Sequence, residues 1–440
     1  MSSKKTYIIG AGFTGLGAGI LSKSKIFEAT SSAGGICASY EREGFHFEIG
    51  GGHWIFGGDP YVLNLVDSIS QCKRYSRKSA VFFAGNLDAT KPYAKTFVDY
   101  PIQNNLFGLG EKASGAILQQ LIASSKSADI PATMEEWLKI NFGELLCDIF
   151  FRPFHEKYTA GLYKEIAPQD AYKSPLSIRD VVDGAFRKPN TDVGYNVSYL
   201  YPHEGLDTLA KKLGAHCNVD YEVALEKIDP STRTLKLSDG RELEFDQLIS
   251  TMPLNKIVEV SGLQRSTQPY TSVMVLNMGV RLADSALARH GNHWLYIPDS
   301  LAGFHRVGYY SNVDPLFLPE RFRDPEKYGS LYIEFAFKNG EKPSPARIET
   351  LCQNTSDELK EWGLINDVLI IDPTWIDVAY TWQKPKSSWV KDSIKQLAQH
   401  GIVSSGRYGG WNFQGIAESM KEGLVIGSTM SLGKDFRPQK

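Results

Sequence analysis

The chain has 440 residues, too many for one small domain, so two or three lobes are expected. Its formal net charge of −2 argues against nucleic acid as the main partner, and no apolar run approaches the roughly 20 residues of a membrane span. The first expected strand begins by residue 7, which leaves no room for a signal peptide. Scattered cysteines without a C-x-x-C motif indicate reduced, buried thiols in a cytoplasmic protein: Cys37, Cys72, Cys147, Cys217 and Cys352.

The segment from residue 7 to residue 28 has a pattern typical of dinucleotide binding. Tyr7-Ile8-Ile9 predicts a strand, a Gly-x-Gly-x-x-Gly turn and a small-residue helix follow, and a second strand ends in Glu28. The glycines permit a tight turn, close approach to a pyrophosphate and close packing of helix on strand, while Glu28 is placed to bind a ribose hydroxyl. The expected contacts are Gly10, Gly12, Phe13, Thr14, Gly15 and Glu28. The alternative is a tight turn between strand and helix that binds no ligand.

Two further glycine clusters favour FAD over NAD as the dinucleotide. Gly34-Gly35 follows Glu28 at a spacing that resembles FAD-dependent enzymes of the amine oxidase and protoporphyrinogen oxidase type. Phe45–Glu48 alternates like a strand and leads into Gly50-Gly51-Gly52-His53. Three glycines in a row suggest a backbone pressed against a flat ring, here the isoalloxazine, so Gly51 and Gly52 are added to the cofactor contacts. The alternative for this segment is a flexible surface loop.

In chain order, the pattern predicts an α/β protein whose Rossmann-like FAD-binding domain is interrupted by a helical lobe and an antiparallel β-sheet lobe. Thr133 and Glu136 are spaced as a capping box at the start of a helix, and Asp239-Gly240 predicts a hairpin turn. The predicted divisions are FAD-binding residues 1–98, a helical substrate lobe 99–192, FAD-binding residues 193–268, a β-sheet substrate lobe 269–392, and FAD-binding residues 393–440.

Six segments in the same order resemble the UDP-galactopyranose mutase family, nearer its eukaryotic-type branch. One is the Gly51-Gly52-His53 loop, which is similar to the family's mobile histidine loop beside the flavin. The others are Tyr100–Asn105, Phe151–Lys157, Gly194–Pro202, the pair Trp294–Pro298 with Phe304–Arg306, and Gly406–Trp411.

The resemblance implies that FAD is active when reduced, with NADH or NADPH as electron donor, and that a nucleotide-diphosphate sugar is the partner. The family interconverts pyranose and furanose sugars through a flavin N5–sugar adduct, in polysaccharide biosynthesis. By this resemblance His53, Arg306 and Arg407 are catalytic, and Arg407 also contacts the cofactor. Arg306 and Arg407 suit bidentate binding of a diphosphate. The implied substrate contacts are Gln103, Asn104, Arg152, Asn196, Tyr296, Arg306 and Arg407. No metal site is expected, and the oligomeric state is left open.

Three positions depart from the family pattern. Thr159 lies in the stretch after Lys157 where the mutases carry a tryptophan, and Phe413 replaces a phosphate-binding tyrosine. Lys386 occupies the altered form of a further tyrosine segment and could place a positive charge on the same phosphate. Because each lost buried hydrogen bond costs about 1–3 kcal/mol, the hypothesis is a substrate other than standard UDP-galactose.

Each assignment has a structural alternative: an interdomain salt bridge for Arg306 and Arg407, a loop histidine for His53, and a helix end for Arg152. Asn196 could cap a turn and Tyr296 could be core, and His155 is interpreted as structural. The competing functions are an FAD-dependent oxidoreductase of the amine or porphyrinogen oxidase type, and a non-catalytic flavoprotein. An oxidase of neutral substrates would not need the set Tyr296, Arg306 and Arg407.

Overall fold

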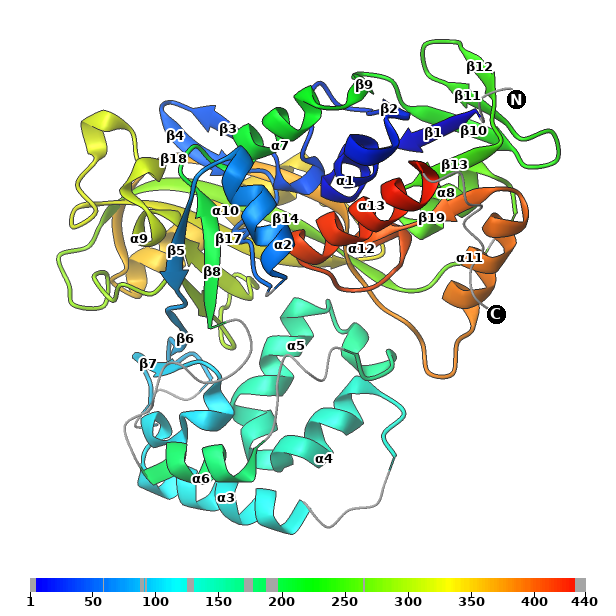
Figure 1. The fold of residues 1–440 in the computed structure, drawn as a ribbon. Coiled ribbons are helices and arrows are strands. Elements are labelled where there is room, and N and C mark those ends of the chain that lie inside the picture. Colours follow the sequence, from blue (N-terminus) through cyan, green and yellow to red (C-terminus); the bar gives the residue numbers. More distant parts are fainter. Residues whose placement is uncertain are drawn as a thin grey trace.

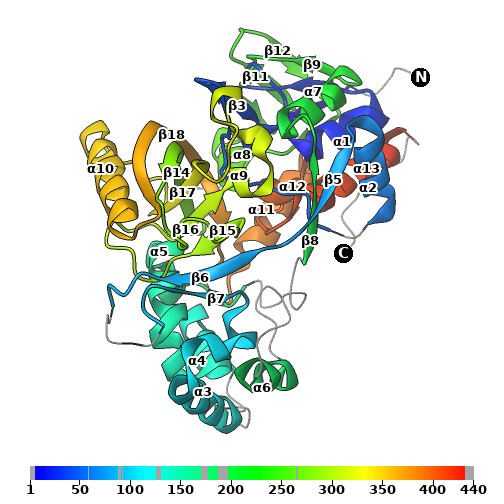
Figure 2. The same cartoon turned by 90° about the vertical axis from the view of Figure 1, so that its left-hand side faces the viewer.

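The computed structural model describes residues 5–57, 59–87, 91, 93–124, 130–169, 177–186, 197–263 and 266–431. Two sheets with their helices lie together, and a lobe of helices lies below them in Figure 1 and Figure 2. This mixed architecture confirms the predicted α/β fold class with a helical lobe and a β-sheet lobe. Within the described residues, no helix combines the length and apolar character that crossing a membrane requires.

The first sheet is parallel throughout and has the strand order β19-β13-β1-β2-β9. Its strands are β1 (Thr6–Ile9), β2 (Lys25–Phe27), β9 (Asn218–Asp220), β13 (Gln247–Ser250) and β19 (Ile402–Ser404). The central strand β1 pairs with β2 on one side and with the much later β13 on the other. Residues 247–250, from the predicted division 193–268, and residues 402–404, from the predicted division 393–440, thus join the same sheet as β1.

Helix α1 (Phe13–Ser22) follows β1 and packs closely against α13 (Ile416–Ser431). A Cβ at Gly17 would lie 2.8 Å from the carbonyl oxygen of Met420, and one at Gly423 would lie 2.1 Å from that of Thr14. Only glycine permits such an approach of two helix backbones. The helix that carries the glycine-rich turn is therefore held by a segment near the other end of the sequence.

The second sheet has seven strands in the order β18-β14-β17-β16-β15-β6-β7, and all pairs are antiparallel except β15 with β6. Its strands are β6 (Ser79–Phe83), β7 (Thr96–Asp99), β14 (Tyr270–Leu282), β15 (Trp294–Tyr296), β16 (Arg306–Tyr309), β17 (Tyr328–Lys338) and β18 (Ile365–Thr381). The prediction placed residues up to 98 in the first part of the FAD-binding domain, but β6 and β7 belong to this sheet. A short buried strand does not reveal by its own sequence which sheet it joins.

The helical lobe contains α3 (Glu111–Ser124), α4 (Met134–Leu146), α5 (Arg152–Tyr158) and α6 (Ile178–Phe186). The predicted capping box is confirmed, because Thr133 Oγ1 accepts from the Glu136 N–H while the Glu136 carboxylate accepts from the Thr133 N–H. Figure 1 shows α5 on the side of the lobe that faces the sheets. Residues on α5 are thereby placed between the lobe and the rest of the molecule.

The remaining elements join or cover these parts. The predicted hairpin is confirmed by β11 (Thr234–Leu237) and β12 (Glu242–Glu244), which pair antiparallel across the turn at Asp239-Gly240. The other strands are β3 (Ser39–Arg42), β4 (Phe45–Glu48), β5 (Cys72–Ser76), β8 (Ser198–Pro202) and β10 (Leu225–Asp229). The other helices are α2 (Pro60–Ile69), α7 (Leu206–Ala215), α8 (Leu254–Val260), α9 (Tyr310–Val313), α10 (Pro345–Glu361), α11 (Trp389–Gln399) and α12 (Gly406–Gly409). All the cysteines are free thiols, although only Cys37 and Cys147 are fully buried.

Candidate functional site

A cavity of about 790 Å³ runs from the glycine-rich turn, past the His53 loop, into the helical lobe. Its volume lies within the range of about 300–1,000 Å³ that is usual for ligand and cofactor sites. All three parts of the fold contribute to its walls. Many of the residues predicted for the site line it: Gly10, Gly12, Phe13, Thr14, Glu28, Gly34, Gly35, Gly52, His53, Thr159, Tyr296, Arg306, Arg407 and Phe413.

The glycine-rich turn fits a dinucleotide. Gly10 has φ +95, and a Cβ there would lie 2.4 Å from Thr251 Oγ1; a Cβ at Gly15 would lie 1.9 Å from the Gly10 carbonyl oxygen. By contrast, a Cβ at Gly12 would meet no protein atom within 4 Å. Gly12 is also the N-cap residue of α1, and no side chain caps the helix there. The protein fold therefore does not require glycine at position 12, whereas a phosphate against the helix N-terminus does.

Glu28 is buried directly after β2, and its carboxylate is hydrogen-bonded to the glycine-rich turn at Ala11. Its Oε2 accepts a hydrogen bond of 2.7 Å from the Ala11 N–H, and its Oε1 accepts from the backbone N–H and the hydroxyl of Thr30 at 2.9 Å and 2.7 Å. Each carboxylate oxygen has two lone pairs, so Oε2 retains one for a ribose hydroxyl. Glu28 lines the cavity, as this role requires.

Replacing Gly12 by valine is expected to abolish flavin binding while leaving the stability of the flavin-free protein nearly unchanged, because a Cβ at Gly12 meets no protein atom within 4 Å and would instead collide with a bound phosphate. The flavin content, measured by the ratio of absorbance at the flavin band to that of the protein, tests this. Gly15→Ala is the matched control, since its Cβ collides with the backbone and should destabilise even the flavin-free protein. A Gly12→Val protein that retains stoichiometric flavin would contradict the assignment.

The three glycines before His53 are explained by protein packing rather than by contact with a flat ring. A Cβ at Gly50 would lie 2.4 Å from the His53 ring, and one at Gly52 would lie 2.2 Å from the Tyr332 hydroxyl. Gly51 has φ +77 and does not line the cavity. The interpretation that all three press against an isoalloxazine therefore needs correction, although Gly52 and His53 do line the cavity.

His53 is a neutral imidazole in this position. Burial and the neighbouring Arg407 charge lower the pKa of His53 to about 4. Its Nδ1 lies 3.1 Å from the Gly51 carbonyl oxygen, which can only accept, so Nδ1 carries the proton. Nε2 is consequently a hydrogen-bond acceptor at neutral pH, and His53 contributes no positive charge to the cavity.

Glu48, at the end of β4, holds the His53 loop through a hydrogen bond to its backbone. Glu48 was not predicted as a functional residue. Its carboxylate accepts from the Tyr201 hydroxyl and from the His53 backbone N–H, the latter at 3.4 Å. Burial raises the pKa of Glu48 to about 8, against the opposing effect of both hydrogen bonds. The indication in the sequence was an acidic residue, Glu48, that ends the strand in which Phe45 and Phe47 alternate.

Three facing residues on neighbouring strands form a row beside the cavity. Arg306, the first residue of β16, is opposite Tyr296 on β15 and Glu334 on β17. Its Nη1 donates to Glu334 Oε1 at 3.1 Å, and its guanidinium lies 5.5 Å from the Tyr296 ring centroid. Burial raises the pKa of Glu334. The positive charge of Arg306 and the contact with His305 lower it by more, so the pKa of Glu334 falls to about 2. Glu334 was missed, although a carboxylate inside the apolar stretch 331–335 marked it.

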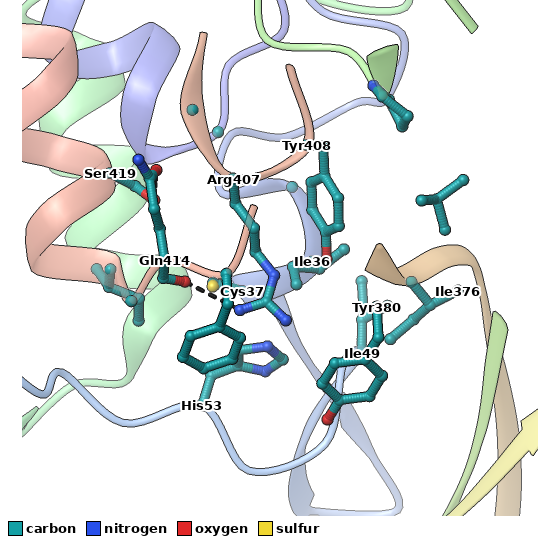
Figure 3. A pocket seen from close by; sticks show the side chains of 18 of the residues that line it. Ile36, Cys37, Ile49, His53, Ile376, Tyr380, Arg407, Tyr408, Gln414 and Ser419 are labelled. Atoms are coloured by element: carbon teal, nitrogen blue, oxygen red, sulfur yellow. Dashed lines mark hydrogen bonds between the residues drawn. The ribbon is translucent and has the colours of Figure 1, made fainter. Parts of the chain in front are cut away.

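Arg407, on α12, also lines the cavity. Its Nη1 donates to the Gln414 carbonyl oxygen at 2.9 Å and its Nη2 to that of Ala379 at 3.3 Å. Figure 3 shows its guanidinium directed between the side chains of His53 and Tyr380. In the part of the chain that the structure describes, no carboxylate lies within 4 Å of Arg407. Its charge is therefore available to an anionic ligand.

Two of the three departures from the mutase pattern line the cavity. Thr159 is buried, and its hydroxyl is committed to the protein: it donates to the His155 carbonyl oxygen at 2.7 Å and accepts from the Tyr163 N–H at 3.0 Å. The Phe413 ring centroid lies 4.4 Å from the Arg407 guanidinium. Neither side chain offers the ligand a free hydroxyl, so both present apolar surface where the mutase pattern has a larger or more polar residue.

Several predicted substrate contacts do not reach the cavity. Arg152 starts α5 but forms ion pairs with Glu144 and Asp148 on the surface, as its helix-end alternative suggested. Lys386 is exposed on the turn after β18 and does not line the cavity. Gln103 and Asn104 were also predicted to contact the substrate, but they are buried in a helical turn against α6 and do not line the cavity. Asn196 lies outside the described residues.

The chain matches one protein family in sequence and several solved structures in fold. A family model for flavin containing amine oxidoreductases matches residues 16–283. The crystal structure of a reduced UDP-galactopyranose mutase is similar with a TM-score of 0.83 and 23% identity, covering 98% of this chain and 96% of that chain. A protein described as a protoporphyrinogen oxidase, from Exiguobacterium sp. 255-15, is similar with a TM-score of 0.70 and 14% identity, covering 99% and 100%. A putrescine oxidase gives a TM-score of 0.59 and 12% identity, covering 98% and 99%. At these identities the likeness concerns the fold.

Proposed function

Because this chain belongs to the flavin containing amine oxidoreductase family, we propose that it binds FAD and isomerises a nucleotide-diphosphate sugar between its pyranose and furanose forms. The glycine-rich turn, with Gly10 and Gly12, would hold the cofactor pyrophosphate, and Glu28 would bind its ribose. When bound and reduced by a nicotinamide donor, the flavin supplies a nucleophilic ring nitrogen without net redox change.

The charge of the cavity supports this proposal over oxidation of an amine. Glu334 balances the Arg306 charge, but no described carboxylate balances Arg407, so this part of the wall is positive. The Arg306 Nε is buried and has no partner among the described residues. Both guanidiniums can therefore donate to a diphosphate, which carries the opposite charge, whereas a protonated amine would be repelled. The unbalanced charge of Arg407 is the observation on which the proposal rests.

The protein groups around this point would bind and orient the sugar nucleotide. Arg306 and Arg407 would hold the diphosphate and stabilise its charge as the bond to the sugar breaks. The neutral His53, with Nε2 as acceptor, would orient a sugar hydroxyl without competing for the diphosphate. Since Thr159 and Phe413 present no free hydroxyl, we propose a substrate other than standard UDP-galactose.

The proposal is tested with the purified protein after its flavin has been reduced by dithionite under argon. The substrates are UDP-galactopyranose, UDP-arabinopyranose, UDP-N-acetylgalactosamine, dTDP-fucopyranose and GDP sugars, with products separated by chromatography and identified by NMR. We expect a furanose nucleotide of unchanged mass, formed only with reduced flavin. The oxidised protein is the control.

The alternative is an oxidase, favoured by the aromatic side chains that line much of the cavity, among them Tyr158, Tyr380 and Trp382. Such walls also suit an apolar amine or a tetrapyrrole. Loss of two hydrogens from a substrate, or release of hydrogen peroxide in air, would replace the mutase proposal by this one.

A further inference from the structure

His155 is a histidine of the cavity wall to which the sequence assigned only a structural role. It lies on α5, its ring lines the cavity, and aromatic rings hold it in place. The centroids of Phe151, Phe154 and Tyr163 lie 6.1, 5.5 and 6.2 Å from that of His155. The ring therefore has one packed orientation in which its two nitrogens have different surroundings.

The hydrogen bonding of His155 assigns its tautomer. Nδ1 lies 2.7 Å from the Phe151 carbonyl oxygen, which can only accept, so Nδ1 carries the proton. Burial lowers the pKa of His155 to about 4, so the ring is neutral at physiological pH. Nε2 then has a lone pair and no proton, and within the described residues the hydrogen bond of the ring is the one made by Nδ1. His155 presents a hydrogen-bond acceptor that the protein does not use.

The position of His155 relative to the arginines indicates which part of a ligand it meets. Its chain neighbour Phe154 packs edge-on against Tyr296, with 5.5 Å between centroids, and Arg306 lies over that same tyrosine. The cavity is also lined by apolar residues of the helical lobe: Met134, Trp137 and Leu138 on α4, and Phe150 between α4 and α5. A diphosphate at the arginines, with its sugar toward His53, would direct its nucleoside into this apolar end, which suits a flat base.

We propose that Nε2 of His155 accepts a hydrogen bond from the ring N–H of the ligand's base, so that the site selects uracil, thymine or guanine and rejects cytosine and adenine. This inference rests on the proposed nucleotide-sugar function. Uracil has a donor at N3, whereas cytosine has an acceptor there, and the cytosine lone pair would face that of Nε2. An acceptor that the bound base covers without giving it a donor weakens binding, and we expect discrimination of about tenfold or more.

The experiment measures binding by isothermal titration calorimetry to the oxidised holoenzyme, so it does not depend on turnover. UDP is compared with CDP, and GDP with ADP, in the wild type, in His155→Phe, and in His155→Gln. We expect the wild type to prefer UDP over CDP, or GDP over ADP, by about tenfold or more, and His155→Phe to reduce that ratio to about one. His155→Gln, whose amide both donates and accepts, should bind both members of a pair and also serves if the phenylalanine variant fails to fold.

The experiment distinguishes failure of the role proposed for His155 from failure of the nucleotide-sugar function. A wild type that binds UDP and CDP, or GDP and ADP, equally, or a His155→Phe variant that keeps the wild-type ratio, would overturn the role of His155 alone. A wild type that binds none of these nucleotides would overturn the nucleotide-sugar function together with this inference. Flavin content and thermal denaturation of each variant confirm that the ratio is compared between folded holoenzymes.

Discussion

Replacing Arg407 by alanine is expected to weaken binding of UDP to the oxidised holoenzyme by about 100-fold, measured by titration calorimetry. The guanidinium lines the cavity without a described carboxylate partner, so two charge-assisted hydrogen bonds to a diphosphate would be lost. A charge-assisted hydrogen bond contributes about 1.5–3 kcal/mol, so two bonds at the low end of that range give about 3 kcal/mol, which corresponds to a factor of roughly 100. The same variant should lose most isomerisation activity.

Two controls separate a loss of ligand binding from a loss of folding. Arg407 also donates to the carbonyl oxygens of Gln414 and Ala379, so thermal denaturation must show that the alanine variant remains folded. Arg407→Lys keeps the charge without the forked geometry and should bind with intermediate affinity. Arg281→Ala removes an exposed arginine that pairs with Asp367, and should leave UDP affinity unchanged. Unchanged affinity in Arg407→Ala would contradict the diphosphate assignment.

Replacing Glu334 by glutamine is expected to destabilise the protein by about 3–5 kcal/mol, measured by urea denaturation. The substitution leaves the largely buried guanidinium of Arg306 without the only carboxylate that the structure places within 4 Å of it in the described residues. A double variant, Glu334→Leu with Arg306→Met, should recover much of the loss because it removes both charges. Asp367→Asn, at an exposed pair, is the matched control and should have little effect.

The contribution of Glu334 should also depend on pH. Its pKa is lowered from 4.5 to about 2 in the folded protein, so the folded state holds the ionised form more strongly than the unfolded state. The stabilisation is fully present above pH 4.5 and is lost as the pH falls toward 2. The stability difference between the wild type and Glu334→Gln should therefore shrink on acidification across that window. A difference that stays constant would show that the carboxylate does not act through its charge.

Local patterns in the sequence predicted the features that depend on neighbouring residues. The turn at Gly10–Gly15, the capping box at Thr133 and Glu136, and the hairpin at Asp239-Gly240 each involve a few consecutive residues whose conformations constrain one another. Residues 247–250 form a strand with the buried apolar residues Leu248 and Ile249 at its centre, as is typical of a parallel strand. These features need no knowledge of the remainder of the chain.

The features that sequence reasoning missed depend on residues far apart in the chain. Glu334 pairs with Arg306 only because β17 places it opposite the start of β16, 28 residues away in the sequence. Likewise, nothing in the sequence of β6 shows that its partner is β15. Lys386 was assigned by resemblance to a tyrosine segment of the mutase family, and such a resemblance does not determine whether a side chain reaches the cavity or the solvent. Such pairings follow from topology rather than from local propensity.

The close packing of α1 on α13 has a consequence for how the chain is made. Strand β1 is among the first segments to leave the ribosome, but its partner β13 follows more than half of the chain later, and α13 emerges only when residue 431 has been synthesised. Until then, β1 and α1 have exposed backbone edges and apolar surface, which favour aggregation. The unit that is started first is therefore completed last, and it lacks a sheet partner and a covering helix for most of the synthesis of the chain.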